Sequence, residues 1–135
     1  MIGLRGRGRM IKILIVDDSV FSQRMNANII KKYLDQSDIS FAADGWEGLK
    51  KFKEQKPDYV FVDLLMPGLD GQSLIKLILQ EDKNANIIVV SADVQKQVRE
   101  EIEQLKIMAF INKPFTEENA EIICKIMKEK DHGKR

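Results

Sequence analysis

Several residue types that build special structures are scarce in this 135-residue sequence. Its single cysteine, Cys124, can form neither an internal disulfide nor a thiolate metal site. The single histidine, His132, lies almost at the end of the chain. No apolar run approaches the ~20 residues of a membrane span, and the N-terminus lacks the apolar stretch of a signal peptide. We therefore expect a reduced, cytoplasmic protein without membrane insertion.

Neither sign of charge dominates, because the chain has 22 basic and 21 acidic residues. The first nine residues carry three arginines and no acid, so the remainder is weakly acidic. This balance does not indicate a nucleic-acid surface, and three arginines make few phosphate contacts. We expect residues 1–9 to be a disordered basic leader, residues 10–130 to form one domain, and residues 131–135 to be a tail.

Short apolar runs alternate five times with amphipathic helical patterns. The expected strands are 11–16, 38–42, 59–63, 86–91 and 108–111. In the first helical pattern, apolar residues recur every four positions, at Phe21, Met25, Ile29 and Tyr33. We expect Trp46, in the second pattern, to be an ordinary packing residue. Strands that alternate with helices predict an α/β fold, with a parallel sheet and helices on both of its faces.

Polar side chains lie at the carboxyl ends of four of the expected strands: Asp17 and Asp18, Asp63, Ser91 and Lys113. Ligand sites of parallel sheets form where the strands end, so these side chains should meet. Three neighbouring carboxylates repel one another unless they share protons or hold a hard cation such as Mg²⁺. The Lys113 ammonium and the Ser91 hydroxyl could bind the remaining oxygens of a phosphoryl group. Asp63 is then a candidate nucleophile that forms an acyl phosphate.

Four motifs resemble the receiver domain of two-component response regulators, and the length resembles the free-standing CheY type. The motifs are ILIVDDS, VFVDLLMPGLDG, VVSAD and FINKPF, and the resemblance spans about residues 10–130. It implies a flavodoxin-like (βα)5 fold with a five-stranded parallel sheet of order 2-1-3-4-5. It also implies a phosphoacceptor signalling domain that assists its own phosphorylation and dephosphorylation, and not an enzyme with turnover.

The resemblance also implies roles for the residues that follow the strands. Asp63 accepts a phosphoryl group from a sensor histidine kinase, a phosphotransfer protein or acetyl phosphate. Asp18, Asp63 and the backbone carbonyl of Leu65 bind Mg²⁺ directly, and Asp17 acts through water. Lys113 contacts the phosphoryl oxygens.

A switch is implied as well. Ser91 moves toward the phosphoryl group while Phe110 turns inward, which changes the face formed by the fourth helix, the fifth strand and the fifth helix. An output protein binds that face, and a phosphatase is a further expected partner. The Lys113–Pro114 bond is expected to be cis. Phe110 stands where a tyrosine is common, so no phenolic hydrogen bond to a partner is available.

Two other functions compete with this interpretation. A Mg²⁺-dependent phosphohydrolase with an aspartyl nucleophile, as in haloacid dehalogenases, would carry a second aspartate two positions after Asp63, where Leu65 stands. A flavodoxin-like carrier of FMN would need a loop rich in Ser, Thr and Gly after the first strand, and DDSVFSQ lacks one. The chain ends about where receiver domains end, so we expect output through protein contacts. The possible settings are chemotaxis or flagellar-motor control, a phosphorelay intermediate, or allosteric control of a kinase.

Overall fold

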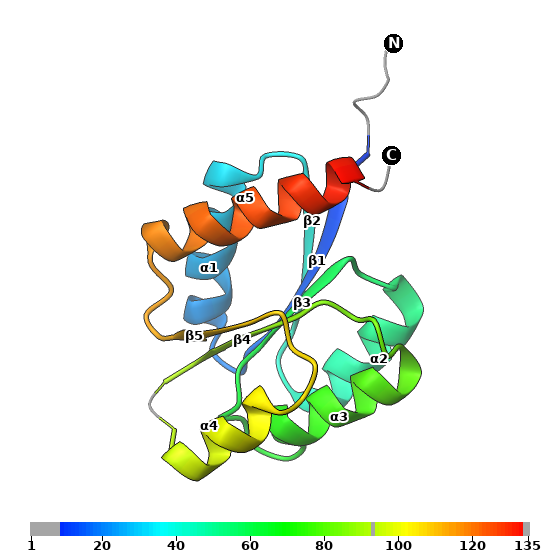
Figure 1. The fold of residues 1–135 in the computed structure, drawn as a ribbon, viewed down its shortest axis with the longest axis vertical. Helices are drawn as coiled ribbons and strands as arrows, with labels where there is room; N and C mark the ends of the chain where they lie inside the picture. Colours follow the sequence, from blue (N-terminus) through cyan, green and yellow to red (C-terminus); the bar gives the residue numbers. More distant parts are fainter. Residues whose placement is uncertain (1–8, 93, 134–135) are drawn as a thin grey trace.

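The computed structural model describes residues 9–92 and 94–133. Strands and helices alternate along the chain (Figure 1): β1 Ile11–Val16, α1 Val20–Tyr33, β2 Ser37–Ala42, α2 Gly45–Gln55, β3 Tyr59–Val62, α3 Gly71–Glu81, β4 Ile87–Ser91, α4 Lys96–Glu103, β5 Ala109–Asn112 and α5 Glu117–Gly133. The strands form one parallel sheet in the order β2-β1-β3-β4-β5. The predicted fold class and strand order are confirmed.

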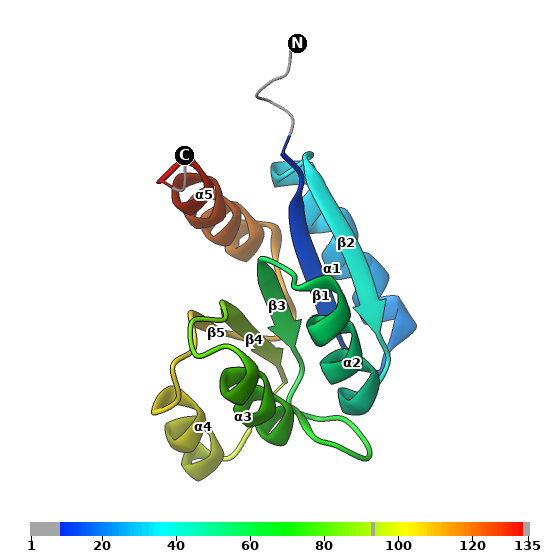
Figure 2. The same cartoon turned by 90° about the vertical axis from the view of Figure 1, so that its right-hand side faces the viewer.

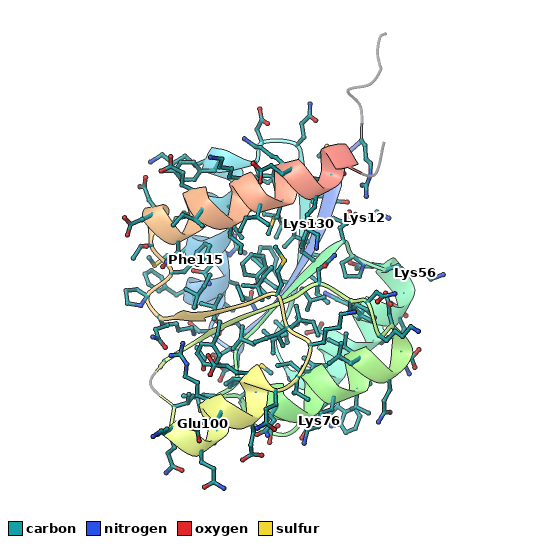
Figure 3. The ribbon with its side chains drawn as sticks, viewed as in Figure 1. Lys12, Lys56, Lys76, Glu100, Phe115 and Lys130 are labelled. Carbon is teal, nitrogen blue, oxygen red and sulfur yellow. The ribbon has the colours of Figure 1, made fainter. Side chains whose placement is uncertain are left out.

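The sheet has a hydrophobic core on each face, because buried strands alternate their side chains between the two faces. In β1, Ile13 and Ile15 pack in one core and Leu14 and Val16 in the other. Helices α1 and α5 cover the first face, and α2, α3 and α4 cover the second (Figures 1 and 2). Charged side chains such as Lys56, Lys76 and Glu100 point away from the body (Figure 3).

Helix α1 is rotated relative to the apolar stripe in its sequence. Phe21 is 75% exposed and Met25 is 42% exposed, whereas Gln23, Ala27 and Ile30 are buried. The helix itself is confirmed, and Ser19 caps it by accepting a hydrogen bond from the Ser22 amide. The rotation leaves apolar side chains on the surface where α1 begins.

The expectation for Trp46 is wrong, because this side chain is 61% exposed. Helix α2 instead turns Gly45, Gly48 and Phe52 toward the protein interior. A Cβ atom on Gly48 would lie 2.9 Å from Cγ2 of Val16, so the glycine allows α2 to lie directly against β1. That contact fixes the helix rotation and leaves Trp46 on the outer side.

Most of the expected leader, residues 1–8, lies outside the described residues, as do residues 134–135 of the tail. Arg9 is described, and its guanidinium lies 2.7 Å from Asp58 and 3.4 Å from Asp131. These ion pairs connect Arg9 to the start of β3 and to the end of α5. Within residues 9–92 and 94–133, no helix is long and apolar enough to cross a membrane.

Candidate functional site

Main-chain hydrogen bonds continue the sheet beyond the strand ends and align the residues that follow them. The amide of Asp17 donates to the carbonyl of Ala42 at 3.0 Å, and the amide of Asp63 donates to Val16 at 3.0 Å. At the other side of the sheet, the Lys113 amide donates to the Ser91 carbonyl at 2.8 Å. The backbone therefore presents these side chains along one edge.

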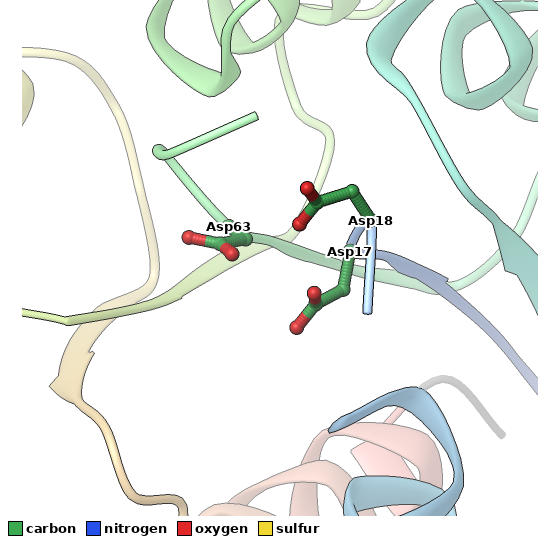
Figure 4. A group of neighbouring side chains, drawn as sticks. All are labelled: Asp17, Asp18 and Asp63. Carbon is green, nitrogen blue, oxygen red and sulfur yellow. The ribbon is translucent and has the colours of Figure 1, made fainter. Parts of the chain in front are cut away.

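Three carboxylates meet at this edge, as the sequence predicted. One oxygen from each of Asp17, Asp18 and Asp63 lies within 4.8 Å of the others (Figure 4). Asp17 and Asp63 are only 2% and 5% exposed, whereas Asp18 is exposed. Clustered carboxylate oxygens open to solvent on one side are the donors that a hard divalent cation prefers. The residues therefore fit a metal ion.

Lys113 lies between two of these acids. Its Nζ donates to Oδ2 of Asp17 at 3.0 Å and to Oδ2 of Asp63 at 3.1 Å. Partial burial lowers the pKa of Lys113, but the hydrogen bond to Asp17 and the charge of Asp63 outweigh it, so the net pKa is raised above 10.5. The ammonium is therefore fully charged at neutral pH, and it offsets part of the carboxylate repulsion.

The other oxygen of the Asp63 carboxylate is held by neutral donors. Oδ1 accepts a hydrogen bond from the buried Ser91 hydroxyl at 2.9 Å and one from the Leu65 amide at 3.0 Å. The Ser91 Oγ in turn accepts from the Leu64 amide at 3.3 Å. Each oxygen of Asp63 thus has a fixed partner, while the Leu65 side chain is 54% exposed. Ser91 already contacts Asp63 in this structure.

Helix α3 begins directly against the main chain of Asp63. A Cβ atom on Gly71 would lie 2.3 Å from the Asp63 carbonyl oxygen and 2.6 Å from Cα of Leu64. Only glycine permits this approach. The sequence did not predict this role of Gly71, because a glycine after a loop gives no sign of what lies against it.

Phe110 lies on β5. Its half-buried ring packs against the core on the α2, α3 and α4 face. The guanidinium carbon of Arg99 lies over the ring. The Lys113–Pro114 peptide bond is cis, as expected.

Comparison with known proteins agrees with this geometry. The response regulator receiver domain family model matches residues 13–125. The chemotaxis protein CheY of Thermotoga maritima is 40% identical over 104 residues, which cover 77% of this chain and 86% of that protein. A protein-glutamate methylesterase/protein-glutamine glutaminase of Geobacter sulfurreducens is 31% identical over 115 residues, 85% of this chain. The match spans only 31% of the methylesterase.

Among solved structures, the CheX–CheY–BeF3–Mg complex from Borrelia burgdorferi matches with a TM-score of 0.79 and 32% identity, over 91% of each chain. The fold and the site define an α/β domain with a cluster of acids at one edge of its parallel sheet, and these similarities specify it further. The chain belongs to the response regulator receiver domain family. These similarities do not favour the phosphohydrolase alternative.

Proposed function

We propose that this receiver domain carries a transient phosphoryl group on Asp63 and signals through altered protein contacts. The arrangement of side chains around the Asp63 carboxylate supports this proposal. A lysine ammonium holds one oxygen, a buried serine hydroxyl holds the other, and two further acids lie alongside. A carboxylate that served only as a strand-end cap would not need these partners.

The transfer step is an in-line displacement. A carboxylate oxygen of Asp63 attacks phosphorus, and the new P–O bond forms as the bond to a histidine nitrogen of the donor breaks. The electron pair leaves with that nitrogen, which takes a proton from solvent. Lys113 then offsets negative charge on a phosphoryl oxygen, and the Ser91 hydroxyl donates to another. With acetyl phosphate as donor, the leaving group is acetate.

The cofactor of this proposal is Mg²⁺. Asp18, Asp63 and the Leu65 carbonyl would bind it directly, and Asp17 would bind it through water. When bound, the ion offsets negative charge shared by the carboxylate and phosphoryl oxygens. The fit rests on the clustering of hard oxygen donors described above.

An exposed apolar patch adjoins the site and supports a protein phosphodonor. Val20, Phe21 and Met25 are exposed at the start of α1. A hollow of about 310 Å³ is lined by Phe21 and Met25 together with Lys113 and Pro114. A sensor histidine kinase or phosphotransfer protein would dock here, because its histidine must come within bonding distance of Asp63.

The proposed output face consists of α4, β5 and α5. Phe110 lies on β5, and the exposed Ile122 and Ile126 add apolar surface on α5. Movement of Ser91 and Phe110 would change this face for an output protein, with chemotaxis or flagellar-motor control as the setting and the cytoplasm as the location. A phosphatase is a further proposed partner, in line with the CheX complex of the Borrelia CheY.

Phosphorylation with acetyl phosphate and Mg²⁺ tests the proposal. Mass spectrometry should find one base-labile phosphoryl group per chain on Asp63, and none in Asp63→Asn. Asp70→Asn is the matched control, because Asp70 is an exposed acid that caps α3. A label elsewhere, or no label, would refute the proposal. Many turnovers per chain would instead favour the phosphohydrolase.

A further inference from the structure

A buried glutamine on α1 reaches the edge of the sheet that carries the acids. Gln23 is 6% exposed, and its Nε2 donates to the carbonyl oxygen of Asp17 at 2.7 Å and to that of Ala42 at 3.3 Å. Carbonyl oxygens only accept hydrogen bonds, so the amide nitrogen must face them. One side chain thus connects α1 to the ends of β1 and β2.

The Asp17 carbonyl belongs to the peptide unit that joins Asp17 to Asp18. Peptide units are planar, so fixing the direction of this oxygen restricts the Cα positions of both aspartates and the directions of their side chains. The Asp17 amide is held by Ala42, and Oδ1 of Asp17 accepts from the Ser19 amide at 2.9 Å. Gln23 supplies the restraint on the carbonyl side.

We infer that Gln23 is a positioning residue for the divalent cation, which it serves by orienting the Asp17–Asp18 peptide so that both carboxylates converge with Asp63. This inference rests on the proposed function, because it requires the ion to bind at these acids. Burial alone does not require an amide at this position, since an apolar side chain of the same length would fill the space. Groups that orient metal ligands typically contribute about 10- to 100-fold to metal affinity.

Replacement by methionine separates positioning from packing. Gln23→Met keeps the length of the side chain and removes both N–H donors. Calorimetric titration should show Mg²⁺ binding weakened by about tenfold relative to wild type. Urea unfolding without Mg²⁺ gives the loss of stability in the same variant. Ile30→Val is the control, because Ile30 is fully buried on the same helix and its shortening destabilises the core without touching the acids.

The outcomes are distinct. Weaker Mg²⁺ binding in Gln23→Met, with wild-type affinity in Ile30→Val, supports the inference. Wild-type Mg²⁺ affinity in Gln23→Met overturns the inference and leaves the proposed function intact. An equal loss of Mg²⁺ affinity in Gln23→Met and Ile30→Val has the same consequence. Absence of Mg²⁺ binding in the wild type refutes the proposed function itself. If Gln23→Met does not fold, Gln23→Asn replaces it, because its amide is one carbon too short to reach Asp17, and the same expectations apply.

Discussion

The guanidinium carbon of Arg99 lies 4.4 Å from the centroid of the Phe110 ring, so α4 and β5 are joined by a cation–π contact. Arg99 also lies 3.4 Å from the Glu103 carboxylate and 3.5 Å from the Asn112 side-chain oxygen. Phe110 has no hydroxyl that could anchor it by a hydrogen bond. The arginine therefore holds the ring in this structure, on the face proposed for output.

A double-mutant cycle of Arg99→Met and Phe110→Leu measures this contact. We expect a coupling free energy of about 0.5–1 kcal/mol in urea unfolding of the unphosphorylated protein. With acetyl phosphate and Mg²⁺ present, the coupling should decrease, because the ring leaves the arginine when it turns inward. Glu103→Gln controls for the loss of the ion pair. Equal coupling in both conditions would show that the ring stays in place.

Under the proposed function, Lys113 and a divalent cation would compete for the same acids. Lys113→Met should therefore bind Mg²⁺ more tightly than wild type, by about fivefold or roughly 1 kcal/mol, because no ammonium then occupies Oδ2 of Asp17 and of Asp63. Phosphorylation by acetyl phosphate should nevertheless slow by about a hundredfold, since the donor to the phosphoryl oxygen is lost. Lys76→Met, on the exposed side of α3, is the control and should change neither the Mg²⁺ affinity nor the rate of phosphorylation. Weaker Mg²⁺ binding in Lys113→Met would contradict the competition.

Lys113 also makes the free energy of unfolding depend on pH, in a direction that its raised pKa determines. Its pKa is raised in the folded protein, so its contribution to stability is complete below the unfolded value of 10.5 and is lost as pH rises through the folded value. The difference in unfolding free energy between wild type and Lys113→Met should be constant from neutral pH to about pH 10 and then shrink. Urea unfolding at a series of pH values measures it, and a difference that grows above that pH would contradict the raised pKa.

The residue pattern was sufficient to predict the strands and the convergence of Asp17, Asp18 and Asp63, whereas the strand order came from the resemblance to receiver domains. Buried parallel strands are continuous apolar runs, and the residues that follow them must share one edge. Helix rotation was not predictable in the same way. Gln23 is buried because its amide has main-chain partners, and that choice of face exposes Phe21. Hydrophobic periodicity contains no information about such a partner.

Gly48 is a second residue whose tertiary contact the sequence pattern does not reveal. In sequence terms it only weakens α2, by ~1 kcal/mol relative to alanine. In the structure, a methyl group there would meet both Cγ atoms of Val16, at 2.9 and 3.0 Å. Gly48→Ala should therefore destabilise the protein by about 1–3 kcal/mol in urea unfolding despite the gain in helix propensity. Adding Val16→Ala should recover part of the loss, and Lys50→Ala on the exposed side of α2 should cost little. A stabilised Gly48→Ala protein would disprove the close contact.

Leu65 lies two residues beyond the proposed phosphoacceptor, its amide donates to Oδ1 of Asp63, and 54% of its surface is exposed. We therefore expect its side chain to lie beside the water that would attack the phosphoryl group. A leucine cannot hydrogen-bond that water, whereas an asparagine can orient it for attack on phosphorus. Leu65→Asn should therefore shorten the lifetime of the phosphoryl group. One hydrogen bond of about 1 kcal/mol changes a rate by roughly fivefold. Trp46→Asn is the matched control, because Trp46 is 61% exposed on α2 and should leave the lifetime unchanged. The decay of phosphorylated protein after removal of the donor measures it, and an equal or longer lifetime in Leu65→Asn would refute the role of this side chain.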